Sequence, residues 1–184
     1  MKVINRKVVF EGKYLRFVSK DAETSTGKRV TWETIERVNI HGKGAVVIVG
    51  LTREKELILE RNWRASLESF IIQFPAGLTD IAEESAEEAA RRELLEETGY
   101  TAKKLIPIIS VPVSPDLTPT TASHFFAPEV EFVGKQNGDA SEEIEVLKIP
   151  VQKLDDFLLN LSRDTKLDLR VPGILWVLEK RNLI

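Results

Sequence analysis

The chain has 184 residues, of which 42% are hydrophobic and 30% are charged, a balance typical of one folded domain and not of a disordered or fibrous protein. Its 26 lysines and arginines against 29 aspartates and glutamates give a formal net charge of −3, which offers no electrostatic reason to expect a nucleic-acid partner. There is no cysteine, so disulfides, thiolate metal sites and cysteine nucleophiles are excluded.

Membrane insertion is not expected from the sequence. The longest apolar run, residues 45–51, falls far short of the roughly 20 residues that a membrane-spanning helix needs. The basic start, with Lys2 and Arg6, is not followed by the apolar region of a secretion signal. We therefore expect a cytoplasmic protein with no membrane partner and, from its charge, no nucleic-acid partner.

Residues 1–42 are expected to form a small N-terminal antiparallel sheet. Apolar and polar residues alternate there as they do in strands, and turn signals at Glu11-Gly12 and at residues 25–28 interrupt the pattern. A glycine-containing joint at 41–44 then leads into the main domain, which we place at residues 43–184. The sequence therefore predicts a small sheet subdomain followed by a larger domain.

The main domain combines strands and helices in an order typical of a mixed sheet covered by helices. It opens with a predicted hairpin of two strands, residues 45–49 and 57–59, around a charged turn. The later predicted elements are a helix at 85–98, strands at 104–113, 123–127 and 145–149, and helices at 151–161 and 172–181. This order favours the α/β (α+β) class, with a mixed β-sheet between helices.

The helix at 85–98 has the clearest end signals in the chain. Ser85 and Glu88 have the spacing of a capping box, and Gly99 stands where a C-terminal cap is expected. Within this helix Glu93 and Glu97 are four residues apart, so their carboxylates lie on one face. The helix therefore presents two like charges side by side.

These two glutamates are candidate metal ligands. Mg²⁺ prefers carboxylate and water oxygens, and a bound cation turns the repulsion between Glu93 and Glu97 into ligation. Glu96 borders the same face, and Arg92, four residues before it, can pair with the carboxylates and hold them in place. The alternative is an acidic helix face that is solvated and binds no metal.

A longer pattern around this helix resembles the signature of the Nudix hydrolases, in which a loop–helix–loop binds Mg²⁺. The pattern consists of Gly77, Glu84 and residues 92–100, which read Arg-Glu-Leu-Leu-Glu-Glu-Thr-Gly-Tyr. Glu84 lies seven positions after Gly77 where the family has six, so the loop at 79–83 contains one extra residue. The other register, through Glu83, would lose the Arg-Glu pair.

The resemblance implies a fold, a cofactor and a set of ligands. We expect the Nudix fold, in which Glu93 and Glu97 hold Mg²⁺, with Mn²⁺ as a substitute. Residues 73–77, Gln-Phe-Pro-Ala-Gly, are similar to the approach to the signature in the ADP-ribose and nucleoside-diphosphate-sugar pyrophosphatase branch. There the carbonyl of the alanine is a metal ligand, which implies the same role for Ala76. Gln73 replaces an acidic residue common in the branch and is a candidate substrate contact.

Two other segments resemble substrate-binding parts of this branch. Asn62-Trp63-Arg64 is similar to its Gln-Tyr-Arg element, whose arginine contacts substrate, and residues 27–33 are similar to the strand whose aromatic residue stacks on the base. This implies Arg64 and Trp32 as substrate contacts, with Arg37 as a further candidate. In such dimers the small N-terminal sheet reaches across to the partner subunit, so a homodimer is expected. From residue type alone, the tryptophan could instead pack in a core and the arginines form surface ion pairs.

The catalytic base is expected in the acidic segment 138–146. In this branch a glutamate from a distant loop often supplies it, and counting back from Ile144 puts Glu142 at the matching position, with Glu143 as the second candidate. Glu142 is also a candidate metal ligand, and Glu96 and Arg92 complete the catalytic set. The alternative is an exposed acidic loop before an edge strand.

Together these features predict a pyrophosphohydrolase that uses Mg²⁺ to neutralise a diphosphate and to activate water. The expected substrate is a nucleoside diphosphate linked to ribose or a hexose, and the products are a nucleoside monophosphate and a sugar phosphate. Asp116 stands where the branch has a glycine, which keeps a hexose open beside ribose. Two alternatives remain: a Nudix enzyme that acts on a nucleoside triphosphate or dinucleotide, and a nucleotide-binding regulator without turnover.

Overall fold

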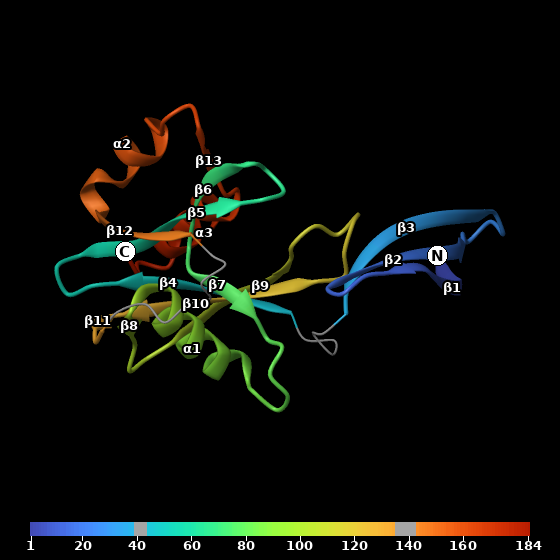
Figure 1. The fold of residues 1–184 in the computed structure, drawn as a ribbon, viewed down its shortest axis with the longest axis horizontal. Coiled ribbons are helices and arrows are strands. Elements are labelled where there is room, and N and C mark those ends of the chain that lie inside the picture. The colour runs from blue at the N-terminus through green and yellow to red at the C-terminus, as the bar shows by residue number, and fades with distance from the viewer. Residues whose placement is uncertain (39–43, 135–142) are drawn as a thin grey trace.

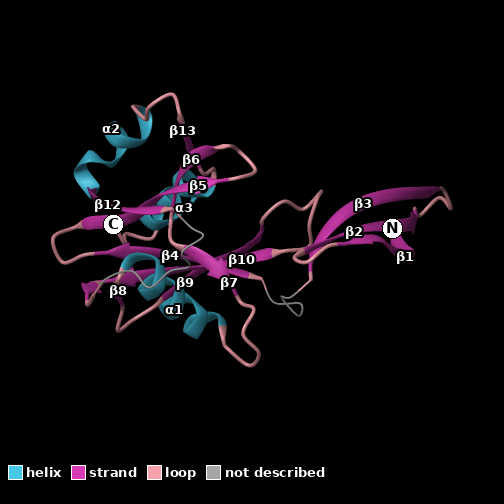
Figure 2. Ribbon diagram, in the orientation of Figure 1, coloured by secondary structure: helices cyan, strands magenta, loops and turns pink. Residues whose placement is uncertain are grey.

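The computed structural model describes residues 1–38, 44–134 and 143–184, which form a large mixed sheet, a separate three-stranded sheet, a two-stranded ribbon and three α-helices (Figures 1 and 2). The three-stranded sheet lies at one end of the elongated molecule and holds the N-terminus. The large sheet and the helices form the main body, where the C-terminus lies (Figure 1).

The large sheet has eight strands among the described residues, and its main path runs in the order β13-β6-β5-β4-β10-β9. β12 also pairs with β5, and β7 with β4. The strands are β4 (Ala45–Leu51), β5 (Glu56–Arg64), β6 (Ser69–Gln73), β7 (Ala76–Leu78), β9 (Ile106–Pro112), β10 (Thr121–Pro128), β12 (Ile144–Pro150) and β13 (Thr165–Leu167). The β4–β10 and β6–β13 pairs are parallel and the others are antiparallel, so the sheet is mixed as predicted.

Nearly all residues of the central strand β4 are buried. Since successive side chains in a strand point to opposite sides, both faces of β4 are covered. On one face Val47 and Val49 pack in a core with residues of α2 (Leu154–Leu159) and α3 (Arg170–Lys180). On the other face Val46 and Ile48 pack against Ala89, Ala90 and Leu94 of α1 (Ala86–Thr98). The prediction of a mixed sheet between helices is therefore confirmed.

Helix α1 has the predicted ends. The hydroxyl of Ser85 accepts the backbone N–H of Glu88 at 3.2 Å, and the Glu88 carboxylate accepts the Ser85 N–H at 2.8 Å, which completes the capping box. At the other end Gly99 has a φ of 74°, and its N–H donates to the Leu95 carbonyl. The helix therefore holds its glutamates in a fixed rotational position above the sheet.

The three-stranded sheet is antiparallel and is built from β1 (Lys2–Glu11), β2 (Leu15–Glu23) and β3 (Arg29–Arg37). Val18 and Ala22 are its buried apolar residues, whereas every residue of β1 is exposed. The Ile35 N–H donates to the Leu117 carbonyl and links this sheet to the main body. The predicted boundary between residues 42 and 43 lies outside the described residues and stays a prediction.

Several short elements differ from the predictions. β6, β7 and β13, of three to five residues each, were not expected, and neither was the ribbon of β8 (Tyr100–Thr101) and β11 (Glu131–Phe132). Segments this short do not repeat a pattern often enough to be recognised. The helix expected at 151–161 is a 3₁₀ turn (Val151–Lys153) followed by the six-residue α2. None of the described helices has the length and apolar character needed to traverse a bilayer.

Candidate active site

A pocket of about 1170 Å³ lies where α1, β7, the three-stranded sheet and the first residue of α3 meet. Its lining includes side chains from β3, β5, β6 and the segment before β10. Eight of the residues predicted for the site line it: Arg37, Arg64, Gln73, Ala76, Arg92, Glu93, Glu96 and Glu97. These residues are up to 60 positions apart in the chain, and the fold brings them to one cavity.

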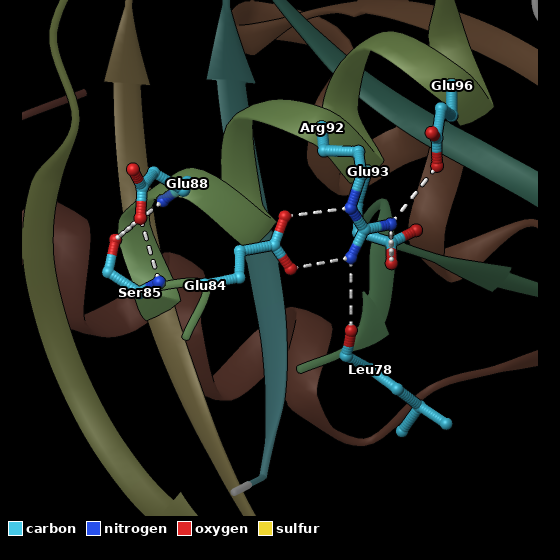
Figure 3. Close-up of polar contacts among 7 residues, drawn as sticks. All are labelled: Leu78, Glu84, Ser85, Glu88, Arg92, Glu93 and Glu96. Carbon is cyan, nitrogen blue, oxygen red and sulfur yellow. Dashed lines mark hydrogen bonds and ion pairs between the residues drawn. The ribbon is translucent and has the colours of Figure 1, made fainter. Parts of the chain in front are cut away.

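Arg92 is the centre of the charged face of α1 (Figure 3). Its Nε and Nη2 donate to the two oxygens of Glu84 at 2.9 and 3.0 Å, so this pair is bidentate. Its Nη1 donates to Glu93 at 2.7 Å and to Glu96 at 3.1 Å. Glu84 raises the pKa of Arg92 above its ordinary value, as do Glu93 and Glu96, so the guanidinium stays charged. One arginine thus fixes three carboxylates.

The bidentate pair also settles which glutamate occupies the loop position of the signature. Glu84 faces Arg92, whereas Glu83 is exposed and has a φ of 64° in the left-handed region. The Glu84 N–H donates to the Ile81 carbonyl at 3.4 Å, which closes a turn at this point. The longer loop is therefore accommodated by a turn before α1, and the charged face keeps its geometry.

Glu93 is the buried carboxylate of this face, and its side chain is only 13% exposed. Burial raises its pKa, while Arg92 acts in the opposite direction. Its carboxyl group lies directly above Gly77 of β7, where no other residue would leave room for it. A burial of this kind is costly for a charge unless a cation is present.

Glu97 joins the helix to β7. It is 5% exposed, and its Oε2 accepts the backbone N–H of Ala76 at 2.8 Å. Ala76, Glu93 and Glu97, the three described residues predicted as metal ligands, therefore lie at one junction between α1 and β7. Ala76 and Glu97 are 21 positions apart, so no local sequence pattern predicts the hydrogen bond between them.

The donor set at this junction fits a hard divalent cation. It consists of carboxylate and carbonyl oxygens, and Mg²⁺ is commonly bound by one or two carboxylates, with water and substrate phosphates as the other ligands. Among the described residues no three acidic or imidazole side chains are gathered closely enough to hold a metal by themselves. The reason is visible in the contacts: Arg92 engages Glu93, and Glu97 is turned toward the Ala76 amide. The site is therefore suited to a cation that arrives with phosphate and water.

A chain of hydrogen bonds reaches another part of the pocket. Nε and Nη2 of Arg64 donate to the Gln73 side-chain oxygen at 3.3 and 3.0 Å, and the Gln73 amide nitrogen donates to Glu60 at 3.4 Å. Glu60 and Gln73 are direct partners on β5 and β6, and both are buried. Gln73 stands where an acidic residue was expected from the resemblance, and the neighbouring strand supplies an acid, Glu60, at the paired position.

Glu60, Asp168 and Arg170 are residues that sequence reasoning missed. Asp168 and Arg170 line the pocket after β13, a strand that was not predicted. Glu60 directly follows three apolar residues of β5, and its place at the end of that run is the one signal in the sequence that could have indicated a buried acid.

Two predicted site residues lie apart from the pocket lining. Trp32 is on β3 with 48% of its surface exposed, and it is not among the described residues that line the pocket. Glu143 is exposed just before β12, and its carbonyl accepts the Trp63 N–H at 3.3 Å. Glu142 lies outside the described residues. The roles of these three residues stay predictions, as do those of the predicted residues that line the pocket.

Comparisons with known proteins agree with the geometry. A family model of the NUDIX domain matches residues 42–168. The chain is 34% identical over 152 residues to an ADP-ribose pyrophosphatase of Bacillus subtilis, which covers 82% of this chain and 79% of that protein. It is 28% identical over 177 residues to a GDP-mannose pyrophosphatase of Cronobacter sakazakii, which covers 90% of each.

Among solved structures, a crystal structure of an ADP compounds hydrolase superposes on this chain with a TM-score of 0.81. The two are 26% identical, and the match covers 97% of this chain and 92% of the other. The superposition therefore includes the three-stranded sheet as well as the main body.

Proposed function

This chain belongs to the Nudix hydrolase family, in its ADP-ribose pyrophosphatase branch, and we propose that it hydrolyses the diphosphate of a nucleoside diphosphate sugar with the help of Mg²⁺. The substrate would be ADP-ribose or a nucleoside diphosphate hexose, and the products a nucleoside monophosphate and a sugar phosphate. The observation that supports this best is the set of carboxylates fixed by Arg92 in a pocket that also contains arginines.

The divalent cation, when bound, would neutralise the diphosphate, orient a water molecule in line with one phosphorus and lower the pKa of that water. Glu93, Glu97 and the carbonyl of Ala76 would hold it, and Mn²⁺ would substitute for Mg²⁺. Arg92 keeps Glu93 and Glu96 in position before substrate arrives. Such a prearranged face costs little reorganisation at the moment of reaction.

Hydrolysis adds water across one P–O bond of the diphosphate, so one proton must leave the attacking water. We propose that Glu142 or Glu143 accepts it. Glu143 precedes β12, whose residue Ile144 pairs with Asn62 of β5, two residues from Arg64. Glu143 therefore lies next to the strand that carries a pocket arginine, which supports the proposal for this residue. Replacing each glutamate with glutamine separates the two candidates, because the base variant loses turnover and the other keeps it.

We also propose that residues 1–42 form a subdomain through which two chains form a homodimer. Its apolar side chains Val3, Val9 and Phe10 are 55%, 54% and 68% exposed, an unusual surface for a monomer. Trp32, exposed on β3 of the same sheet, would stack on the base of the nucleotide in the partner subunit's pocket. Arg37, which lines the pocket of its own chain, would contact the same substrate.

A comparison of three substrates tests the proposed reaction. The purified chain is incubated with Mg²⁺ and either ADP-ribose, GDP-mannose or ATP, and the products are separated by anion-exchange chromatography. AMP from ADP-ribose, or GMP from GDP-mannose, with the matching sugar phosphate, is the expected result. Products from ATP alone would indicate a nucleoside triphosphate substrate, and no product from any of them would indicate a regulator. Either of these two results contradicts the proposal.

A further inference from the structure

A second group of charged pocket residues lies away from α1, where β5, β6 and the start of α3 meet. Figure 1 shows β5, β6 and β13 together on one side of β4 in the main body and α1 on the other. Arg64, Gln73, Asp168 and Arg170 line the pocket in this part.

Strand pairing places Asp168 beside Gln73. β13 runs parallel to β6, with Leu167 paired to Ile72, and the Asp168 N–H donates to the Ile72 carbonyl at 2.9 Å. The next residue of β6 is Gln73, whose side-chain oxygen accepts Arg64. Arg64 and Arg170, which are 106 positions apart in the chain, therefore approach one site.

Asp168 holds Arg170 by one edge of its guanidinium. Nε of Arg170 donates to both carboxylate oxygens at 3.0 Å, and Nη2 also donates to Oδ2. Nη1 makes no hydrogen bond to any residue that the structure describes. The Arg170 side chain is 32% exposed, and it lines the pocket. Arg170 therefore presents two fixed N–H donors, and a guanidinium fixed in this way loses little entropy when it binds an anion.

Among the pocket-lining residues of this group, two arginines stand against one carboxylate, that of Asp168. Burial would raise the pKa of Asp168, but hydrogen bonds from Arg170 and the charges of Arg170 and Arg64 bring it below its ordinary value. Asp168 is therefore a carboxylate at neutral pH, set against two arginines. The face of α1 is the reverse, because Arg92 stands among Glu84, Glu93, Glu96 and Glu97. The two arginines of this group can therefore bind a phosphate directly.

We propose that Arg170, oriented by Asp168, is a substrate-binding residue, and that with Arg64 it forms a subsite for the phosphate group that the metal does not activate. This inference rests on the proposed function, since it divides one diphosphate between two parts of the pocket. Guanidinium groups match phosphate geometry and form charge-assisted hydrogen bonds with it. Asp168 is a positioning residue, because it acts through Arg170.

Steady-state kinetics of Arg170→Gln on ADP-ribose with Mg²⁺ test the subsite. We expect kcat/KM to fall about 10- to 100-fold, mostly through a higher KM, which corresponds to the loss of one or two charge-assisted hydrogen bonds. Arg170→Lys keeps the positive charge but loses the paired N–H donors of the guanidinium, so its KM should lie between those of wild type and Arg170→Gln. Asp168→Asn should raise KM with a smaller change in kcat. Arg181→Gln, at an exposed residue just after the end of the same helix, is the matched control and should leave both constants unchanged.

Binding of inorganic pyrophosphate, measured by calorimetry without turnover, separates this inference from the proposed function. If the wild-type chain hydrolyses no nucleotide sugar yet loses pyrophosphate affinity on Arg170→Gln, the subsite stands and the proposed reaction fails. If both Arg170→Gln and Arg170→Lys keep the wild-type KM and pyrophosphate affinity, the subsite is contradicted. The melting temperature of each variant, including the conservative Arg170→Lys, shows whether any loss of affinity comes from a loss of the fold.

Discussion

The carboxyl group of Glu93 lies where a side chain at position 77 would have to be. A Cβ atom built on Gly77 would fall 1.9 Å from Glu93 Cδ and 2.1 and 2.2 Å from its two oxygens. Real Cβ atoms do not approach other atoms so closely, so any residue other than glycine must displace Glu93. Gly77 is thus required for the position of a proposed metal ligand and not for a turn.

The Gly77→Ala variant should therefore lose activity. We expect Glu93 to move away from β7 and kcat on ADP-ribose to fall at least about 10-fold, the lower range seen when residues that orient metal ligands are lost. Gly173→Ala is the matched control, because a Cβ at Gly173 meets no atom within 4 Å and lies in the exposed part of α3. That variant should keep its activity and gain up to about 1 kcal/mol in the free energy of unfolding. Equal kinetics for the two variants would contradict the account of Gly77.

A second prediction concerns the buried pair Glu60 and Gln73. Glu60→Gln should raise the KM for ADP-ribose several-fold, because the chain that orients Arg64 loses its charge. Gln73→Glu places two carboxylates side by side in the interior and should destabilise the fold by about 1–3 kcal/mol. The double variant restores one acid and one amide, so its KM and melting temperature should return toward wild type. Strictly additive effects in this double-mutant cycle would show that the two side chains are not coupled.

The parts of the site that the sequence predicts are those that depend on local spacing. Glu93 and Glu97 share a face because they lie four residues apart on a helix with clear caps, and the spacing to Arg92 favours Glu84 over Glu83. These positions require only the geometry of one helix and its loop.

The remaining parts depend on pairing between distant strands. Glu60 meets Gln73 through the register of β5 and β6, and Asp168 reaches Gln73 through the parallel pairing of β13, a strand of three residues. Neither register can be derived from hydrophobic periodicity, since the side chains involved are polar and the strands short. The contacts of Gln73 with its neighbours on β5 and β13 therefore could not be predicted from the sequence and are known only from the structure.

A third prediction concerns the stability of the three-stranded sheet. Glu36 accepts a hydrogen bond from Arg6 at 2.5 Å and pairs with Arg16 at 3.3 Å and Lys20 at 3.1 Å. The contact with Arg6 first, and then that with Lys20, lowers the pKa of Glu36 from 4.5 to about 2. A carboxylate whose pKa is depressed by folding stabilises the fold above its unfolded pKa, and that contribution is lost as the pH falls from about 4.5 to 2.

The Glu36→Gln variant measures this contribution. At pH 7 its free energy of unfolding should be lower than that of wild type by an amount on the order of 1 kcal/mol, because the pairs lie partly in solvent. The difference should shrink toward zero near pH 2. Urea denaturation at both pH values provides the comparison, and a difference that is independent of pH would contradict the assigned role of Glu36.

A fourth prediction concerns the proposed homodimer. The wild-type chain should have the mass of a dimer in size-exclusion chromatography with light scattering, and Phe10→Ser should shift it toward the monomer mass. Phe10 is 68% exposed in the single chain and lies on the fully exposed strand β1. Leu159→Ser changes a side chain that is 83% exposed on α2 and should leave the dimer intact. A monomeric wild type, or a Phe10→Ser variant that stays dimeric, would contradict the N-terminal interface.

The central claim is that the carboxylates of α1 hold the cation that makes diphosphate hydrolysis possible. The most direct measurement is the rate at which Glu97→Gln releases AMP from ADP-ribose at saturating Mg²⁺, relative to wild type. Glutamine can still accept the Ala76 N–H, so the contact between helix and β7 is kept while the negative charge is removed. The account predicts at least about a 100-fold loss of rate with an unchanged melting temperature. A rate close to that of wild type would contradict it.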